Sequence, residues 1–206
     1  PVLRARIIAE AEQAMNLRWG GASGVYIFGN QQELTDAMRV LGTDSAGEAV
    51  VRILEEADNG VILRFGSEAD LIEIMQHPSV SIACDCDSVL TGTRVHPRYW
   101  GTFPKVLGEY VREKNALTLE DAVYKMTGLP AATIGIKDRG LLKPGMAADL
   151  TIFDAASIID NASYENPTAA PDGIIYVVIN GEFAYTDGAV TGVQAGTVLS
   201  RRNSVQ

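Results

Sequence analysis

Helical spacing of apolar residues marks three segments of the chain, and each segment has a start signal. Ser45, Ser67 and Thr118 are each followed three residues later by Glu or Asp, a pattern typical of a helix N-cap. Apolar residues then recur every three to four positions. Gly128 and Pro130 are expected to end the last of these helices, because glycine is favoured after a helix and proline cannot continue one.

Short apolar runs of strand-like composition lie between the helical segments. They cover residues 25–28, 61–64 and 80–84, and a helix is predicted before them over residues 4–15. Strands that alternate with helices favour a parallel sheet covered by helices. The third run ends in acidic residues, so we expect these acids at the carboxyl end of a strand.

Strand signals come closer together in the last third of the chain. Residues 148–153, 174–179 and 182–185 are rich in β-branched and aromatic side chains. The pair Asn180-Gly181 between the last two runs is the strongest short signal for a hairpin. These runs indicate an antiparallel sheet.

The two patterns divide the chain into an α/β portion over residues 1–134 and a mostly β portion over residues 135–206. With 206 residues, of which 47% are hydrophobic and 21% charged, the chain is long enough to bury a core. No apolar run reaches the roughly 18 residues of a membrane span.

The charge balance limits the partners. Lys and Arg number 17 and Asp and Glu 26, which gives a net charge of −9. Binding to nucleic acid or to an anionic membrane surface needs clusters of Lys and Arg, so we expect neither partner. The two cysteines stand one residue apart and make a poor disulfide framework, which predicts a reducing, cytoplasmic compartment.

The first candidate site is the run Cys84-Asp85-Cys86-Asp87. Functional residues of α/β barrels gather at the carboxyl ends of the strands, where a carboxylate can bind a metal and act as a general base. The alternative is a strand-end turn whose acids only keep it solvated. On a strand Cys84 and Cys86 share one face and Asp85 points to the other, so the thiols and Asp85 are not expected to serve one site.

A zinc site built from both cysteines and both histidines is a competing hypothesis. The candidate ligands would be Cys84, Cys86, His77 and His96. One residue between the cysteines is closer than the usual spacing of structural zinc ligands. Buried structural cysteines are therefore the preferred interpretation.

A second candidate site is the segment His96-Pro-Arg-Tyr-Trp-Gly-Thr-Phe-Pro104, predicted as a loop. Arg98 offers a planar fork that suits a substrate carboxylate. The alternative is a structural loop that seats its aromatic side chains on the core.

Four motifs resemble the D-aminoacylase (N-acyl-D-amino-acid deacylase) family of amidohydrolases. The narrowest is the run from His96 to Pro104, which resembles the segment after the last barrel strand. Residues 122–131 resemble the helix and turn that follow, residues 139–154 look like the return into a small β-sandwich, and residues 178–182 resemble its closing hairpin. The resemblance is firm from about residue 67 onward and looser before it.

The resemblance implies the last βα units of a (β/α)8 barrel, followed by part of a β-sandwich. It also implies a zinc-dependent enzyme that cleaves the acyl amide bond of N-acyl-D-amino acids. In the family an aspartate at the end of the last barrel strand meets the metal and carries the proton from the attacking water to the leaving amine. By the same resemblance Arg98 would hold the substrate carboxylate, with His96 and Tyr99 beside it in the binding loop.

Two aspartates compete for the family position. The family has a His-Pro pair, a short apolar strand and then Ser-Asp-Gly, and counting from His77 places its aspartate on Asp85. Counting backward from His96 favours Asp87 in relatives with a shorter loop. Asp85 is preferred, because strand length is more constrained than loop length. Cys86 stands where the family has glycine.

The other metal ligands of the family have no counterpart in this sequence, so the chain alone is expected to be inactive and to bind zinc weakly or not at all. Two further readings stay open. One is a non-catalytic piece that forms a homo-oligomer, or associates with the missing N-terminal part, to cover its exposed sheet edges. The other is a cyclic-amide hydrolase similar to dihydroorotase.

Overall fold

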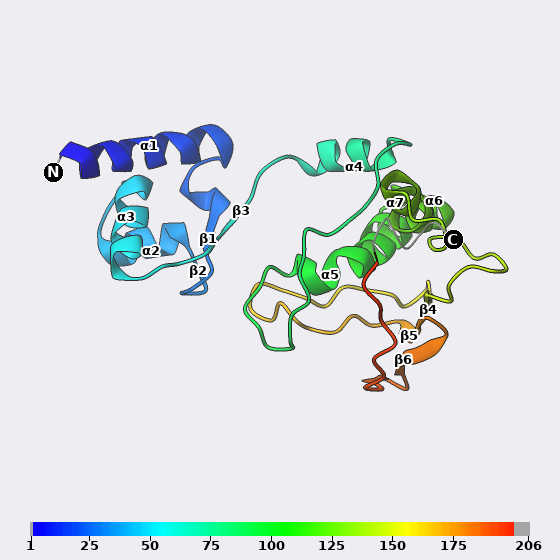
Figure 1. Cartoon of the computed structure of the whole chain (residues 1–206). Coiled ribbons are helices and arrows are strands. Elements are labelled where there is room, and N and C mark those ends of the chain that lie inside the picture. Colours follow the sequence, from blue (N-terminus) through cyan, green and yellow to red (C-terminus); the bar gives the residue numbers. More distant parts are fainter. Residues whose placement is uncertain (1, 200–206) are drawn as a thin grey trace. The chain divides into compact units, whose positions relative to one another are not determined.

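The computed structural model describes residues 2–199, and within them the chain forms two compact units. One unit ends at Asp70 and the other begins at Leu71 (Figure 1). The predicted division between residues 134 and 135 stays a prediction.

Three helices form most of the N-terminal unit. They are α1 (Val2–Arg18), α2 (Leu34–Leu41) and α3 (Ala46–Glu56), with a short 3₁₀ turn η1 (Ala22–Gly24). The predicted cap of α3 is confirmed, because the Ser45 hydroxyl accepts a hydrogen bond from the Glu48 backbone N–H at 3.1 Å. Helix α1 confirms and extends the predicted segment 4–15. Arg4 ties α1 to α3 through ion pairs to Glu48 and Glu55, at 2.8 and 3.0 Å.

The sheet of this unit is antiparallel, so the predicted parallel arrangement is wrong here. Its order is β2 (Gln32–Glu33), β1 (Val25–Ile27), β3 (Val61–Leu63), and both pairings run antiparallel. The turn between β1 and β2 is too short for the crossover that parallel neighbours need. Its Gln31 takes a positive φ of 51°, as tight turns require.

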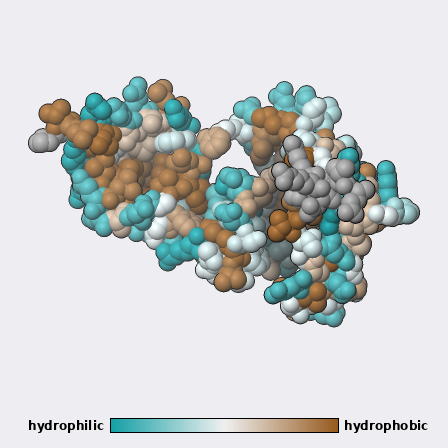
Figure 2. Space-filling model, viewed as in Figure 1, coloured by the Kyte–Doolittle hydropathy of each residue, from teal (hydrophilic) through white to brown (hydrophobic). Residues whose placement is uncertain are grey.

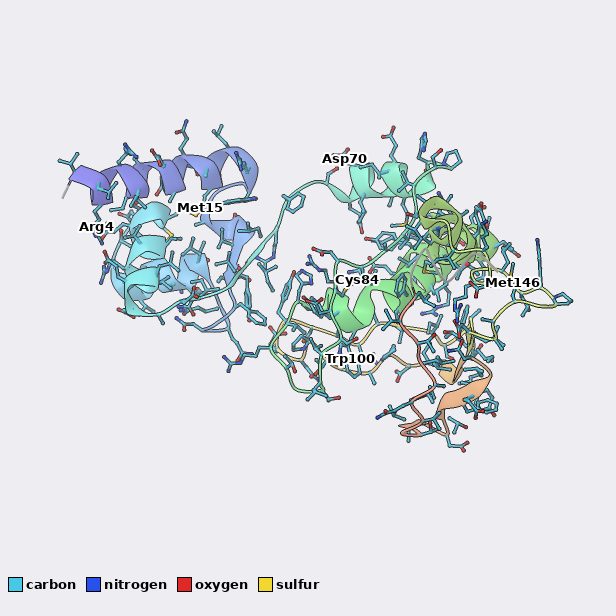
Figure 3. The ribbon with its side chains drawn as sticks, in the orientation of Figure 1. Arg4, Met15, Asp70, Cys84, Trp100 and Met146 are labelled. Carbon is cyan, nitrogen blue, oxygen red and sulfur yellow. A yellow bond between two sulfur atoms is a disulfide. The ribbon has the colours of Figure 1, made fainter. Side chains whose placement is uncertain are left out.

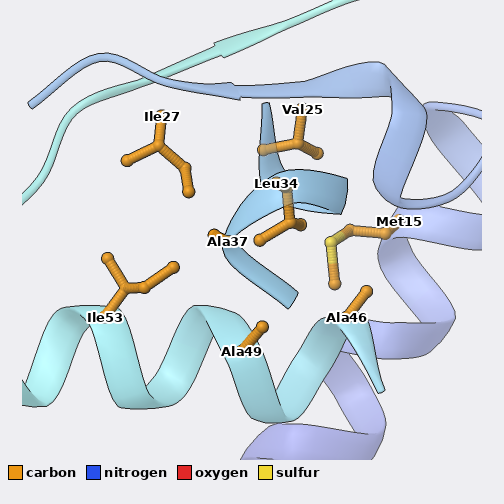
Figure 4. Packing of buried hydrophobic residues seen from close by; sticks show 8 residues of the cluster. All are labelled: Met15, Val25, Ile27, Leu34, Ala37, Ala46, Ala49 and Ile53. Atoms are coloured by element: carbon orange, nitrogen blue, oxygen red, sulfur yellow. The ribbon is translucent and has the colours of Figure 1, made fainter. Parts of the chain in front are cut away.

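A single apolar cluster holds the N-terminal unit together (Figure 4). Its members come from α1, β1, α2 and α3 and include Met15, Ile27, Leu34 and Ile53. Leu34 and Ala49 are fully buried. Apolar side chains also gather on the visible surface of this unit (Figure 2).

The remaining helices belong to the C-terminal unit, except that the first residues of α4 lie before the boundary at Asp70. They are α4 (Glu68–Gln76), α5 (Arg98–Lys105), the π-helical segment η2 (Val106–Glu113), α6 (Leu119–Met126) and α7 (Gly128–Ile134). The caps predicted for α4 and α6 are confirmed, because Ser67 and Thr118 accept backbone hydrogen bonds from Asp70 and Asp121, both at 3.1 Å.

One prediction fails among these helices. The segment 96–104 is mostly helix rather than loop, and Pro104 lies inside it. Proline there removes one backbone donor, and the wider π-helical hydrogen bonding begins two residues later. The helix predicted to stop at Gly128 and Pro130 does end there, at Met126, and these two residues begin a separate helix, α7. Proline is tolerated there because the first turn of a helix has no intrahelical N–H bonds to lose.

The predicted strand at residues 80–84 is also wrong, since this segment has no strand partner. It is instead fixed to α6 by the Ile82 backbone N–H, which donates to the Lys125 carbonyl at 2.9 Å. An apolar run thus forms an extended connection that packs on a helix. The acids that follow it are consequently at the end of a loop segment, not at the edge of a sheet.

The second sheet confirms the three strands predicted in the last third of the chain. Its order is β4 (Leu150–Phe153), β5 (Ile174–Ile179), β6 (Glu182–Thr186) and β7 (Ala189–Val190), all antiparallel. Asn180 and Gly181 make the predicted hairpin turn with φ of 48° and 87°, as the favoured two-residue turn needs. Arg139 bonds to Asp149 and to the Asn180 side chain, which ties the start of β4 to this turn.

One face of this sheet and the helices share the second core. Its buried members are Met75, Val106, Leu107, Tyr110, Leu117, Ala122 and Ile158. Phe153 and Ile174 of the sheet pack against them. Across residues 2–199 the fold is therefore mixed α/β with two separate antiparallel sheets, and these strands do not close a barrel. Within the same range no helix is long and apolar enough to cross a membrane.

Candidate functional site

Asp85 and Arg98 form the centre of the candidate site. The Arg98 Nη2 lies 3.0 Å from Asp85 Oδ2, and Arg98 Nε donates to the Asp85 backbone carbonyl, also at 3.0 Å. The guanidinium thus contacts both the side chain and the backbone of Asp85. The Asp85 side chain is 97% exposed and that of Arg98 43%, so the pair lies open to solvent and can be reached by a ligand.

His96 supports Arg98 from the start of the helix. The Arg98 backbone N–H donates to His96 Nδ1 at 3.0 Å, so the free ring nitrogen of the neutral imidazole is the one that carries its proton. Partial burial, with the positive charge of Arg98 as a second cause, lowers the pKa of His96 below its ordinary value. The ring also meets the edge of Tyr164, with centroids 6.0 Å apart.

The two cysteines lie on the other side of Arg98. Figure 3 shows Cys84 beside α5, whose first turn also carries Trp100. The sulfurs of Cys84 and Cys86 are 3.3 and 3.6 Å from the Arg98 carbonyl oxygen. Both sulfurs thus face the backbone carbonyl of Arg98, whereas Asp85 contacts the guanidinium. Cys84 and Cys86 lie side by side, with their Cα atoms 5.3 Å apart.

The remaining candidates do not join this group. Asp87 is exposed, and within residues 2–199 no ion pair to it is found. Tyr99 is half-buried in the first turn of α5, where its backbone N–H donates to the His96 carbonyl at 3.1 Å. His77 accepts a hydrogen bond from the Ser79 backbone N–H at 3.3 Å. The contacts therefore bring Asp85, Arg98 and His96 together, with Tyr99 joined to His96 through its backbone only, and do not include Asp87 or His77.

Sequence reasoning did not identify Lys125 as part of the site's support. Its side chain is only 5% exposed, and its ammonium donates to the carbonyls of His77 and Val80. Together with the bond from Ile82, these contacts hold the segment that leads to Asp85 against α6. The signal in the sequence was a lysine among the apolar positions of a predicted helix, one position before Met126, which indicates a buried ammonium group with fixed acceptors.

The described part of the chain does not form a zinc site. No group of three or more His, Cys, Asp or Glu side chains in residues 2–199 lies close enough to hold a metal ion. The hypothetical site of two cysteines and two histidines is thus contradicted. A lone carboxylate such as Asp85 falls short of the three or four protein ligands that zinc needs.

Comparison with known proteins identifies relatives over most of the chain. A family model described as the amidohydrolase family matches residues 18–185. D-aminoacylase of Alcaligenes xylosoxydans xylosoxydans is 43% identical over 142 residues, which are 69% of this chain and 29% of that protein. N-acyl-D-aspartate deacylase of the same organism is 38% identical over 175 residues, or 84% of this chain and 34% of that protein. The chain spans about a third of the length of these curated relatives.

Solved structures agree. A crystal structure of D-aminoacylase superposes with a TM-score of 0.75 at 31% identity, over 96% of this chain and 46% of the other. N-acyl-D-glutamate deacylase from Bordetella bronchiseptica, complexed with zinc and a phosphonate mimic of the tetrahedral intermediate, superposes with a TM-score of 0.70 at 30% identity. That match covers 86% of this chain and 37% of the other.

The family model, the sequence relatives and the superposed structures agree. The chain belongs to the amidohydrolase family, in the branch of the D-aminoacylases and other N-acyl-D-amino-acid deacylases.

Proposed function

We propose that this chain is part of an N-acyl-D-amino-acid deacylase, in which Asp85 is the general acid and base and Arg98 the anchor of the substrate carboxylate. The observation that carries the proposal is the double contact of Arg98 with Asp85. It sets a carboxylate that can move a proton beside a cation that can bind an anionic substrate, at an open surface.

The contacts leave Arg98 able to take a second anion. A guanidinium has five N–H donors, and the contacts with Asp85 use its Nε and Nη2. A substrate carboxylate can occupy the remaining donors. The amide of an N-acyl amino acid lies next to its carboxylate, so binding at Arg98 brings the bond to be cleaved toward Asp85. His96 and Tyr99 would then flank the bound carboxylate.

Asp85 would serve both halves of the hydrolysis. Its carboxylate takes a proton from the water that attacks the amide carbon, and the protonated acid returns that proton to the amine nitrogen as the C–N bond breaks. Solved relatives contain zinc or are described by a binuclear metal centre. We expect zinc in the intact protein, with Asp85 as a ligand and the other ligands supplied by residues outside this sequence.

A cyclic-amide hydrolase is the second candidate. Dihydroorotase of Lactobacillus acidophilus is 29% identical over 99 residues, which are 48% of this chain. The deacylases match more of the chain at higher identity, so the acyclic N-acyl-D-amino acid is favoured as substrate.

The decisive experiment compares this chain with a version extended at its N-terminus to the length of its relatives. Zinc content is measured by mass spectrometry, and hydrolysis is measured on N-acetyl-D- and N-acetyl-L-amino acids and on dihydroorotate. We expect zinc and D-specific turnover in the extended protein alone. Near-stoichiometric zinc with turnover in the short chain would show that it carries a complete site, and preference for dihydroorotate would favour the second candidate.

Substitutions in the extended protein then assign the acid. Asp85→Asn is expected to lower kcat by about 10²- to 10⁴-fold, the range for loss of a general acid or base. Asp87→Asn is the matched control and should stay near the parent. Arg98→Lys should raise KM by about tenfold or more, because a charge-assisted fork becomes a single point charge. If Asp87→Asn lowered kcat and Asp85→Asn did not, the general acid and base would be Asp87.

A further inference from the structure

Lys125 places a positive charge inside the C-terminal unit. Its side chain is only 5% exposed, and it is one of the two buried residues of α6, next to the second core. Its ammonium donates to the backbone carbonyls of His77 and Val80. Both acceptors are neutral, and no carboxylate in the described part of the chain forms an ion pair with this ammonium.

A lysine in this position does little for stability by itself. A buried charge loses its hydration, and neutral carbonyls compensate only part of that loss. Methionine, which is also unbranched, would fill the same space without this cost. His77 is exposed and Val80 half-buried, so water could replace the ammonium at their carbonyls. The acceptors of the ammonium therefore indicate a role other than stability.

The segment that Lys125 holds is the one that leads to Asp85. The ammonium binds two carbonyls of the turn after α4, and the Ile82 backbone N–H donates to the Lys125 backbone carbonyl at 2.9 Å. The His77 carbonyl also accepts the Val80 backbone N–H at 3.1 Å, so the ammonium adds the link from this turn to α6. Residues 80–85 belong to no strand, and consequently no sheet fixes their path.

Two residues thus hold this segment from two different helices. Arg98 of α5 contacts Asp85 itself, and Lys125 of α6 holds the residues just before it. We propose that Lys125 is a positioning residue, whose ammonium determines where Asp85 lies relative to Arg98. This role rests on the proposed function, because only there does the Asp85–Arg98 pair act on a substrate. The ammonium itself takes no part in the proton transfer.

Hydrogen exchange of the unsubstituted chain, measured by NMR at single amides, tests this hold without any activity. The Ile82 amide should exchange more slowly than the amides of Ser81 and Ala83, which make no backbone hydrogen bond in the described chain. Equal exchange at the three amides would overturn the proposal. This measurement needs no variant and stays informative if a substitution at Lys125 prevents folding.

Substitution of Lys125 separates positioning from stability. In Lys125→Met the Ile82 amide should exchange roughly ten- to a hundredfold faster, the range for loss of a hydrogen bond to a charged group. The midpoint of urea unfolding should stay near that of the parent. Lys125→Arg keeps a cation with several donors and should restore slow exchange. Lys143→Met, at an exposed position, is the control for the lost charge and should change neither quantity.

Two outcomes would contradict this separation. If Lys125→Met lowered the urea midpoint and left the exchange of Ile82 at the parent rate, the lysine would serve stability alone. If Lys125→Arg folded like the parent but exchanged as fast as Lys125→Met, the donors of the cation would not hold the segment.

The catalytic consequence is measured in the extended protein, as kcat and KM for an N-acetyl-D-amino acid. In Lys125→Met kcat should fall about ten- to a hundredfold, the scale for displacement of a catalytic group by about 1 Å. KM should change little, because Arg98 is held within its own helix. Lys125→Arg should recover most of kcat. Parent values of both constants in Lys125→Met, or a rise in KM alone, would overturn the positioning role.

The two kinds of measurement keep the two proposals apart. If the extended protein had no deacylase activity and its Ile82 protection still depended on Lys125, the proposed function alone would fail. If the extended protein were active and Lys125→Met changed neither exchange nor kcat, the positioning role alone would fail.

Discussion

At the scale of single residues, the sequence indicated Asp85 and Arg98 as candidates but did not indicate all of the contacts around them. The positions of Asp85 and Arg98 came from motif resemblance, and the structure shows them in direct contact. Nothing in the sequence indicated that the Arg98 backbone would donate to His96. That bond depends on the turn of the chain at the start of α5, and the segment was expected to be a loop.

His96 gives a prediction about pH. Its folded-state pKa lies below the ordinary value, because burial and then the charge of Arg98 disfavour the imidazolium. As the pH falls through about 6.5, the unfolded chain gains a proton that the folded chain does not bind. The free energy of unfolding, measured by urea denaturation, should therefore be lower at about pH 5.5 than at about pH 7.5.

His96→Gln should remove much of this difference, whereas His77→Gln should keep it. The chain has only these two histidines. Carboxylates with a lowered pKa, such as Glu109 beside Lys114, lose their contribution only at more acidic pH, below about 4.5. An unchanged slope in His96→Gln would show that another group titrates in this window.

At the scale of elements, capping signals and turn chemistry were reliable because they are local. Ser45, Ser67 and Thr118 accept the hydrogen bonds that their sequence pattern predicts. The failures came where tertiary contacts decide. The apolar run at 80–84 packs on α6 instead of joining a sheet, and the segment 96–104 is helical in spite of its proline. No local pattern encodes which surface a short apolar run will meet.

Helix α5 also contains a glycine whose role is visible only in the fold. Gly101 is buried, and a Cβ added there would overlap the carboxylate of Asp160. That carboxylate is held in place by the Ala162 backbone N–H, which donates to it at 2.8 Å. Alanine would normally favour a helix over glycine by about 1 kcal/mol. We predict the opposite sign for Gly101→Ala, a loss of about 1–3 kcal/mol in unfolding free energy from overpacking.

Urea denaturation of a double-mutant cycle tests this prediction. Asp160→Ala in the Gly101→Ala background should recover part of the loss, because it removes the overlapping group. Gly196→Ala, where an added Cβ meets no atom within 4 Å, should be nearly neutral. A stabilised Gly101→Ala variant would mean that α5 and Asp160 separate at no cost.

At the scale of the whole molecule, the motifs predicted the family correctly. The described strands, however, do not close a barrel. Local patterns correctly predicted the strands after residue 135. The chain covers less than half of the D-aminoacylase structure it matches. The strands in hand pair antiparallel with their neighbours. A barrel needs its complete set of strands, and this chain spans only about a third of the length of the curated relatives it matches.

The second sheet leaves large apolar side chains partly exposed in the described chain. Ile152, Tyr176 and Phe183 are 38%, 37% and 52% exposed, and the two aromatic rings meet edge to face at 5.6 Å. Phe153 and Ile174 of the same sheet pack on the helices. Such a sheet fits half of a sandwich, which buries both of its inner faces.

We therefore predict that the chain alone self-associates through these exposed side chains of the sheet, which sedimentation velocity over a range of concentrations will detect. Ile152→Lys combined with Phe183→Lys should shift it toward the monomer, because two charges would have to be buried. Leu90→Lys with Leu142→Lys adds the same charge at loop residues that are 83% and 85% exposed and should leave association unchanged. A monomeric parent chain would contradict this prediction, because the exposed apolar side chains would then tolerate water. Equal effects of the two lysine pairs would also contradict it, because added charge alone would then explain the shift.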